Sequence, residues 1–398
     1  MSTPSADYPE LKLKPREDRR LRAGHLWVYS NEVDTAATPL AGLAAGTLVR
    51  LSSAEGRFLG YAGVSPHSLI AARILSRDPA HPPGRPLLVH RLKIALALRE
   101  RLYAHGCYRL LFADGDGVPG LIADRFGDIV VLQSGTAAIE AMKGEVVDAV
   151  RKVVAPAGIL WRNDGAAREL EGLERYVEVA DGAVPDEVIV NEGDIALTAP
   201  VHSGQKTGWF YDQRDNRARL ARYRPASLLD VYSYTGAWGL SAAARGARAT
   251  LVDSSAAALD CAARDAARLG LQVEALQGQA FDVMKALAEE GRSFEAVVVD
   301  PPAFIKRRKD HKAGLAAYQR ASQLAIRLLD RDGLLVSCSC SFHLSQDELL
   351  LAVQRAARHL GRTLQVLEIG GQAADHPSHP LIPETRYLKA VFCRVLAG

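Results

Sequence analysis

The stretch "SLLDVYSYTGAWGLSAAARGARATLVDSS", Ser227–Ser255, decides the fold of the C-terminal half of the chain. It begins with the apolar run "SLLDV", turns at a glycine, continues with a helical pattern and ends in a second apolar run, "ATLVD". Strands that are apolar throughout and alternate with helices are typical of a parallel sheet covered on both faces. We therefore predict a doubly wound, mostly parallel α/β domain over residues 191–398.

The same alternation continues up to residue 341. Apolar runs are separated by stretches in which apolar residues recur every three or four positions, which predicts strands and helices in turn. The further predicted strands are 274–279, 294–302 and 334–341, and the predicted helices are 237–246, 257–270, 280–291 and 318–333.

Two smaller domains are predicted before this one. Residues 1–76 hold short alternating runs with glycine turns, which is typical of a small β-barrel. The proline-rich segment "RDPAHPPGRP", Arg77–Pro86, interrupts that pattern and predicts a domain boundary. Residues 77–190 combine two helical patterns with four short strands, so we predict a central α+β domain there.

Composition and charge narrow the class of protein. A chain of 398 residues is too long for one ordinary core, and it has no apolar run of membrane-spanning length. Its five cysteines show no disulfide framework and its N-terminus shows no apolar signal region, so we expect reduced thiols in the cytoplasm. The net charge is only +3, but Lys and Arg cluster at 12–22 and 306–312. These clusters predict phosphate contacts, although a solvated surface would give the same pattern.

Acidic residues follow the strands at the edge where a parallel sheet binds its ligand. Asp230 precedes the turn "VYSYTG", and Asp253 follows the next strand, where a carboxylate can bind a ribose diol. Any one of these acids could instead cap a helix. Their order and spacing together match the S-adenosylmethionine pattern of class I methyltransferases, which have a Rossmann-like fold. The predicted cofactor residues in this series are Asp230, Tyr232, Tyr234, Gly236, Asp253, Gln279, Asp282 and Asp300.

The fourth strand ends in "DPPAF", Asp300–Phe304. Pro301 and Pro302 lack N–H groups and hold an extended backbone, so their carbonyls can accept from the exocyclic amine of a base. Phe304 can offer a stacking face to a base taken out of its helix. N-methyltransferases of adenine or guanine carry a similar motif, so this stretch alone does not choose the methylated atom.

Cys338 and Cys340 end the following strand and admit several interpretations. A zinc site would need two more ligands, and Cys107, Cys261 and Cys393 show no suitable spacing. A redox pair or ordinary core packing is also compatible with the pair. As a nucleophile, a cysteine here would add to carbon-6 of a pyrimidine and make carbon-5 reactive toward the methyl group. Asp300 could then protonate ring nitrogen N3.

The chain resembles bacterial 23S rRNA cytosine-C5 methyltransferases with an N-terminal PUA domain. The resemblance covers nearly the whole length and rests on several specific motifs in family order. They are "KPREDRRLRAGHLWVYSNEV", "GRFLGYAGVSPHSLIAARILS", "DGDGVPGLIADRFGD", "ELEGL", "GQKTGWFYDQRDNR", "DVYSYTGAWGLSAA", "DPPAF", "SCS" and "QAADHP".

The resemblance implies roles for particular residues. Lys206, Gln213 and Arg214 would lie close to the cofactor, and Cys340 would be the nucleophile, because Cys338 aligns with a position that is not cysteine in the family. Asp300 would sit at the target base. The sequence departs from the family at Gln279, where an acidic residue is usual. His376 in "DHP" could position substrate or simply cap a loop.

The leading expectation is an enzyme that forms 5-methylcytosine in 23S rRNA with S-adenosylmethionine and without a metal. An N-methyltransferase of guanine or adenine and a non-catalytic RNA-binding assembly factor are the alternatives. A second copy of the chain is a further candidate partner.

Overall fold

A computed structural model describes residues 8–397 and divides the chain into two compact units. The first unit comprises the chain up to Val188 together with Pro200–Trp209 and Asp375–Thr385, and the second comprises the rest. The division into domains 1–76, 77–190 and 191–398 therefore stays a prediction. Buried polar contacts explain why short later segments join the first unit. Arg162 donates to the carbonyls of Val201 and Gly204, and the Arg109 N–H donates to the Asp375 carboxylate at 2.9 Å.

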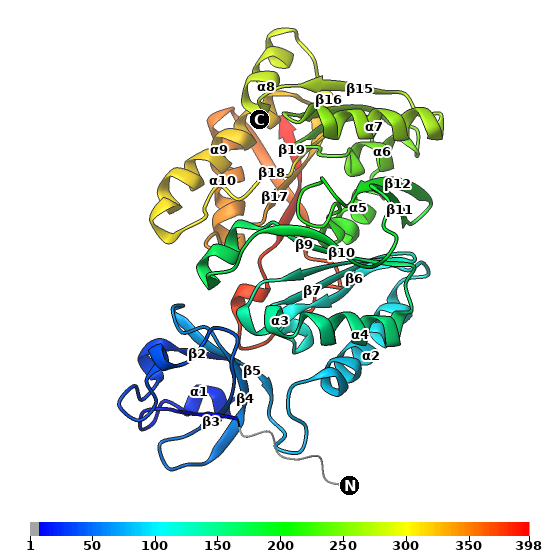
Figure 1. Ribbon diagram of the computed structural model, residues 1–398. Helices are drawn as coiled ribbons and strands as arrows, with labels where there is room; N and C mark the ends of the chain where they lie inside the picture. Colours follow the sequence, from blue (N-terminus) through cyan, green and yellow to red (C-terminus); the bar gives the residue numbers. More distant parts are fainter. Residues whose placement is uncertain (1–7, 398) are drawn as a thin grey trace. The chain divides into compact units, whose positions relative to one another are not determined.

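The second unit is built on a seven-stranded sheet in the order β15-β14-β13-β16-β17-β19-β18. Figure 1 labels β15, β16, β17, β18 and β19 of this sheet. The strands from β15 to β17 are parallel, and β19 runs antiparallel to both β17 and β18. The predicted doubly wound α/β fold is confirmed. The strands are β13 (Ser227–Val231), β14 (Arg248–Asp253), β15 (Val273–Gln277), β16 (Phe294–Val299), β17 (Leu329–Ser339), β18 (Arg362–Gly371) and β19 (Lys389–Ala397).

Helices cover both faces of this sheet. One core cluster joins the sheet to apolar residues of α8, α9 and α10, and another joins it to α5 and α6. The central strands are almost completely buried, which is why most of their residues are apolar. The helices are α5 (Arg214–Ala221), α6 (Ala237–Ala243), α7 (Ala256–Leu269), α8 (Ala280–Glu289), α9 (His311–Arg327) and α10 (Gln346–His359).

The first unit holds two five-stranded sheets. In the sheet β1-β3-β4-β5-β2, a bridge between Leu13 and Val33 brings the ends of the first and last strands together, as the predicted small barrel requires. The other sheet has the order β10-β9-β8-β7-β6, and its apolar core includes residues of α2 and α4. The strands are β1 (Glu10–Lys12), β2 (Trp27–Tyr29), β3 (Leu48–Ser52), β4 (Phe58–Val64), β5 (Ile70–Ser76), β6 (Cys107–Phe112), β7 (Leu121–Phe126), β8 (Ile129–Ser134), β9 (Gly158–Asn163) and β10 (Tyr176–Gly182). The helices are α1 (Arg19–Arg22), α2 (Arg85–Leu102), α3 (Ala137–Ala141) and α4 (Lys143–Val154), and a separate strand pair is β11 (Glu187–Glu192) with β12 (Ile195–Pro200).

The described part of the chain shows neither a membrane-spanning helix nor a metal-binding cluster. Within residues 8–397, no helix has both the length and the apolar character needed to cross a membrane. The same part of the chain contains no group of three or more His, Cys, Asp or Glu side chains arranged to hold a metal ion.

Candidate active site

The site begins at the centre of the seven-stranded sheet. β13 and β16 are neighbours, but the chain continues from β13 toward β14 on one side and from β16 toward β17 on the other. Ligands bind at such a switch point, beyond the carboxyl ends of the strands. The Asp300 N–H donates to the Val231 carbonyl at 3.2 Å, which fixes the exits of the two strands beside each other.

Asp230 is a fully buried carboxylate at this switch point. Its Oδ2 accepts from the Gly239 N–H at 3.0 Å, whereas Oδ1 has no hydrogen-bond partner among the described residues. Burial, together with the charges of Asp300 and Asp253, raises the pKa of Asp230 to about 7. An unsatisfied buried carboxylate oxygen is costly, so this position favours a cationic or hydrogen-bonding ligand.

The turn after β13 is strained and tightly packed. Tyr232 and Tyr234 adopt positive φ angles of 66° and 51°, which are uncommon for non-glycine residues. Gly236 follows at φ 79° and is the N-cap of α6. In the first turn of α6, a Cβ on Gly239 would lie 2.2 Å from Leu251 Cδ2, so a larger residue there would require the Leu251 side chain to shift. These constraints explain the composition of the turn.

Asp253 braces the same turn from the end of β14. Its Oδ2 accepts from the Tyr234 N–H at 2.8 Å and its Oδ1 accepts from the Ser255 N–H at 2.9 Å. A carboxylate oxygen has two lone pairs, so each oxygen can still accept a hydroxyl. The position therefore suits the predicted ribose contact and also holds the loop in place.

Asp300 lies directly after β16 and is held from two sides. Gln213 Nε2 donates to its Oδ1 at 2.9 Å, and Trp238 Nε1 donates to its Oδ2 at 3.2 Å. Burial raises the pKa of Asp300 to about 6, with a further contribution from the charge of Asp212. Asp212 itself accepts a hydrogen bond from the Tyr387 hydroxyl. A carboxyl group with this pKa can exchange a proton near neutral pH.

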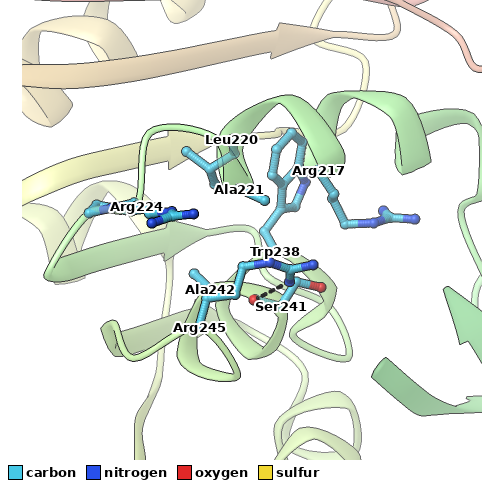
Figure 2. A pocket seen from close by; sticks show the side chains of 9 residues that line it. Arg217, Leu220, Ala221, Arg224, Trp238, Ser241, Ala242 and Arg245 are labelled. Atoms are coloured by element: carbon cyan, nitrogen blue, oxygen red, sulfur yellow. Dashed lines mark hydrogen bonds between the residues drawn. The ribbon is translucent and has the colours of Figure 1, made fainter. Parts of the chain in front are cut away.

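Trp238 separates Asp300 from a small pocket between α5 and α6. Figure 2 shows the indole between Leu220 and Arg217, and Arg245 donates to the Ser241 carbonyl at 2.9 Å. The pocket volume is about 10 Å³, which is room for no more than one water molecule. It is too small for a cofactor, so the pocket belongs to the packing that supports the indole.

The two cysteines of β17 differ sharply in their surroundings. Cys338 is fully buried and packs in the core beside β19, and burial raises the pKa of its thiol well above the ordinary value. Cys340 follows the strand and is only partly buried, and its Sγ lies 4.0 Å from the Pro301 carbonyl oxygen. A reactive thiol must be reachable, so the surroundings favour Cys340 over Cys338 as a nucleophile.

The serines on either side of Cys340 anchor it to α9. The Ser339 hydroxyl donates to the Tyr318 hydroxyl at 2.8 Å, and Tyr318 and Ser341 hydroxyls lie 2.9 Å apart. Ser341 Oγ also accepts from the Ile305 N–H at 3.1 Å, beyond the Asp-Pro-Pro motif. This buried network gives the "SCS" motif a physical purpose, because it fixes the backbone that carries the thiol.

The predicted base-binding residues differ in exposure. Pro301 is buried and Pro302 is exposed. The Phe304 ring packs 4.8 Å from the Tyr318 ring and 6.3 Å from the Tyr232 and Phe281 rings, measured between centroids. Much of that ring is thus engaged in aromatic packing, and its stacking role stays a prediction.

Three further residues that the sequence predicts near the cofactor are Gln279, Asp282 and Arg214, and they differ in exposure. Gln279 is exposed at the N-cap of α8 and makes no side-chain capping bond. Asp282 is 75% exposed, and its carboxylate lies 3.6 Å from Lys285. Arg214 is buried, 3.7 Å from Glu192. Their contact with a cofactor stays a prediction.

Lys206 and His376 belong to the first unit. Lys206 has a positive φ of 52°. His376 is buried, its Nδ1 lies 2.7 Å from Asp375 Oδ1, and its ring packs against Phe112. These contacts support the loop-fixing interpretation of His376.

Sequence reasoning did not identify Asp212, Trp238, Tyr318, Tyr387 or Lys389. The Lys389 ammonium donates to the Ser341 carbonyl next to Cys340. The motif "GWFYDQR" places Asp212 directly before Gln213, which was the one available signal.

The two basic clusters are also placed by the structure. The side chains of Lys306–Lys309 are exposed. In the N-terminal cluster, Arg16, Arg19 and Arg22 line one surface pocket, whereas Arg20 is paired with Glu32 at 2.7 Å.

Comparisons with known proteins agree with this architecture. A family model described as a PUA-like domain matches residues 11–77, and one described as conserved hypothetical protein 95 matches residues 216–321. A solved structure from Streptococcus mutans, assigned as a SAM-dependent methyltransferase, aligns with a TM-score of 0.80 over 97% of this chain and 100% of that chain, at 19% identity. The tRNA m1G37 methyltransferase of M. jannaschii aligns with a TM-score of 0.51 over 78% and 79%, at 14% identity. These likenesses show the fold.

Relatives with higher identity show the family. Ribosomal RNA large subunit methyltransferase I of Alteromonas mediterranea is 34% identical over 392 residues, which are 96% of this chain and 98% of the relative. The protein of the same name from Vibrio cholerae is 32% identical over 400 residues, covering 98% of this chain and 100% of the relative. The chain belongs to the family of the ribosomal RNA large subunit methyltransferase I proteins.

Proposed function

We propose that this protein is an S-adenosylmethionine-dependent methyltransferase that forms 5-methylcytosine in large-subunit ribosomal RNA through a covalent thiol adduct. The observation that carries the proposal is the partly exposed Cys340 thiol, 4.0 Å from the Pro301 carbonyl that follows Asp300. A nucleophile, an acid and a carbonyl acceptor for the base amine thus come from adjacent strand ends.

The electrostatics of the site suit this cofactor. Asp230 and Asp300 carry pKa values of about 7 and about 6 because burial disfavours their charged forms. S-adenosylmethionine carries an ammonium and a sulfonium group, and nearby positive charge favours ionised carboxylates. Asp253 at the end of β14 is suited to the ribose hydroxyls. When bound, the cofactor supplies an electrophilic methyl group.

The protein's own groups would handle the base in a balanced sequence. The Cys340 thiolate forms a bond to carbon-6 of cytosine while N3 takes a proton from Asp300, and carbon-5 becomes nucleophilic. After carbon-5 is methylated, its hydrogen leaves as a proton that passes to solvent. The sulfur–carbon bond then breaks, the thiolate is released and N3 returns its proton to Asp300. The Pro301 carbonyl can accept from the exocyclic amine throughout.

The RNA substrate follows from the family and from the surface. Its relatives are named as methyltransferases of large-subunit ribosomal RNA, and we assign 23S rRNA to this chain on that ground. The PUA-like domain and the exposed Lys306–Lys309 segment are suited to its phosphates. The cytoplasmic location and the homodimer remain predictions.

An N-methyltransferase is the second candidate function. The Asp-Pro-Pro carbonyls could hold an adenine or guanine amine, and the fold is shared with a tRNA m1G37 methyltransferase. Cys340 and the network around it would then have no chemical use.

The product distinguishes the two functions. Purified protein is incubated with unmodified 23S rRNA and cofactor, and the digested nucleosides are analysed by mass spectrometry. We expect 5-methylcytidine from the wild type and from Cys338→Ala, and none from Cys340→Ala. A methyl group on nitrogen, formed equally by Cys340→Ala, would replace this proposal with the N-methyltransferase.

A further inference from the structure

Lys389 is a buried cation beside the proposed nucleophile. It begins β19, is only 9% exposed, and pairs with Ser339 across the β17–β19 ladder. Its Nζ donates to the Ser341 carbonyl at 2.5 Å. Lys389 is therefore tied to the residues directly before and after Cys340.

The surroundings of Lys389 leave its charge poorly compensated. Burial lowers the pKa of Lys389 to about 8, while Cys340 and Glu348 act in the opposite direction. Glu348 is already engaged, because His311 Nε2 lies 2.8 Å from its carboxylate and the Ser345 N–H donates to it at 2.8 Å. A buried ammonium is costly unless an anion accompanies it. A Cys340 thiolate would supply that anion.

The other titratable groups to consider around Cys340 are Tyr318, Cys338 and Asp300. Tyr318 of α9 and Cys338 of β17 have pKa values that burial raises, so both are neutral near pH 7. Asp300 follows β16 and would oppose a thiolate when ionised. The Lys389 ammonium can offset this repulsion between the Asp300 carboxylate and the Cys340 thiolate.

We propose that Lys389 is a positioning residue that holds Cys340 in its thiolate form at neutral pH. This rests on the proposed role of Cys340. A neighbouring ammonium lowers the proton affinity of a thiol, as in other enzymes with reactive cysteines. The same bond to Ser341 fixes the backbone next to the thiol, so charge and position are supplied by one side chain.

The test measures thiol reactivity and needs no RNA. The full-length protein is treated with iodoacetamide between pH 5 and pH 10, and the alkylation rate of the Cys340 peptide is followed by mass spectrometry. We expect Lys389→Met to reduce the rate at pH 7 by up to about tenfold, since a rise of about one pKa unit lowers the thiolate fraction by at most that factor. The rates of variant and wild type should converge above about pH 9, where the thiol ionises without help.

Two further variants separate charge from structure. Lys389→Arg keeps the positive charge and should retain a wild-type pH profile. Arg394→Met removes an exposed cation from the same strand, and its profile should also match the wild type. An unchanged midpoint in a folded Lys389→Met protein would overturn the proposal and leave Lys389 a structural residue.

Methylation assays distinguish failure of this proposal from failure of the proposed function. Lys389→Met should lower kcat at pH 7 and shift the activity optimum upward. If the alkylation profile shifts but Cys340→Ala still methylates RNA, the coupling of Lys389 to Cys340 stands and the nucleophilic role of Cys340 falls. If the alkylation profile does not shift and Cys340→Ala is inactive, the nucleophilic role of Cys340 stands and the coupling of Lys389 to Cys340 falls.

Discussion

Replacing Asp230 with Asn tests whether the switch point disfavours a negative charge. The folded-state pKa of about 7 lies above the ordinary value of 3.8, so the native state prefers the protonated acid. That preference adds stability which is fully present below about pH 4 and is lost as the pH rises through about 7. From these values, ionisation of Asp230 should lower the unfolding free energy of the wild type by about 2–3 kcal/mol as the pH rises from 5 to 8.

The Asn variant isolates this effect. Its side-chain oxygen can still accept from the Gly239 N–H, and the cost of its buried amide does not change with pH. Urea unfolding of both proteins without cofactor, at pH 5 and pH 8, gives the difference in unfolding free energy. That difference should move in favour of Asp230→Asn by about 2–3 kcal/mol. Asp300 titrates in both proteins, so it enters the difference only through its charge coupling to Asp230. A difference that is the same at both pH values, within about 0.5 kcal/mol, would refute the reasoning.

Two other predictions concern the cofactor and the RNA. Asp253→Ala should weaken S-adenosylmethionine binding by about 1.5–3 kcal/mol in calorimetry, because a charged hydrogen bond and the brace on the Tyr234 N–H are lost; an unchanged affinity would remove Asp253 from the site. Replacing the exposed Arg307, Arg308 and Lys309 with Gln should flatten the salt dependence of RNA binding and leave cofactor binding intact. If the slope does not change, this cluster is simply a solvated surface.

The positions of the central strands along the chain could be predicted because each is a mostly apolar run. The run "SLLDV" coincides with β13, and the strand-end acids follow from the same pattern. The last two strands could not be identified in this way. β18 is largely exposed and shows no continuous apolar run. β19 is mostly apolar and buried, but it joins the sheet by antiparallel pairing with β17 and β18, which an alternation of strands and helices does not predict. The start of α9 at His311 was also missed, since "HKAG" lacks a strong apolar period.

The placement of candidate residues could be predicted where they follow strands, but not where distant segments converge. Cys340 and Asp300 were expected to lie close together because the ends of adjacent parallel strands meet at one edge of the sheet, and their catalytic roles stay a prediction. Tyr387 and Asp212 are hydrogen-bonded but lie 175 positions apart in the sequence, and Trp238 and Asp300 lie 62 positions apart. No local sequence pattern predicts either contact. The position of Lys389 next to Cys340 was not predicted for the same reason, because it depends on the register between β17 and β19.

The covalent role of Cys340 is the central claim, and trapping tests it most directly. Ribosomal RNA transcribed with 5-fluorocytosine offers a target carbon that cannot lose its substituent as a proton after methylation. With S-adenosylmethionine present, wild type and Cys338→Ala should form a stable protein–RNA adduct that survives denaturing electrophoresis, and peptide mapping should place the bond on Cys340. Cys340→Ala should form none. An adduct formed equally by Cys340→Ala, or the absence of any adduct from an enzyme that still methylates ordinary RNA, would contradict the account.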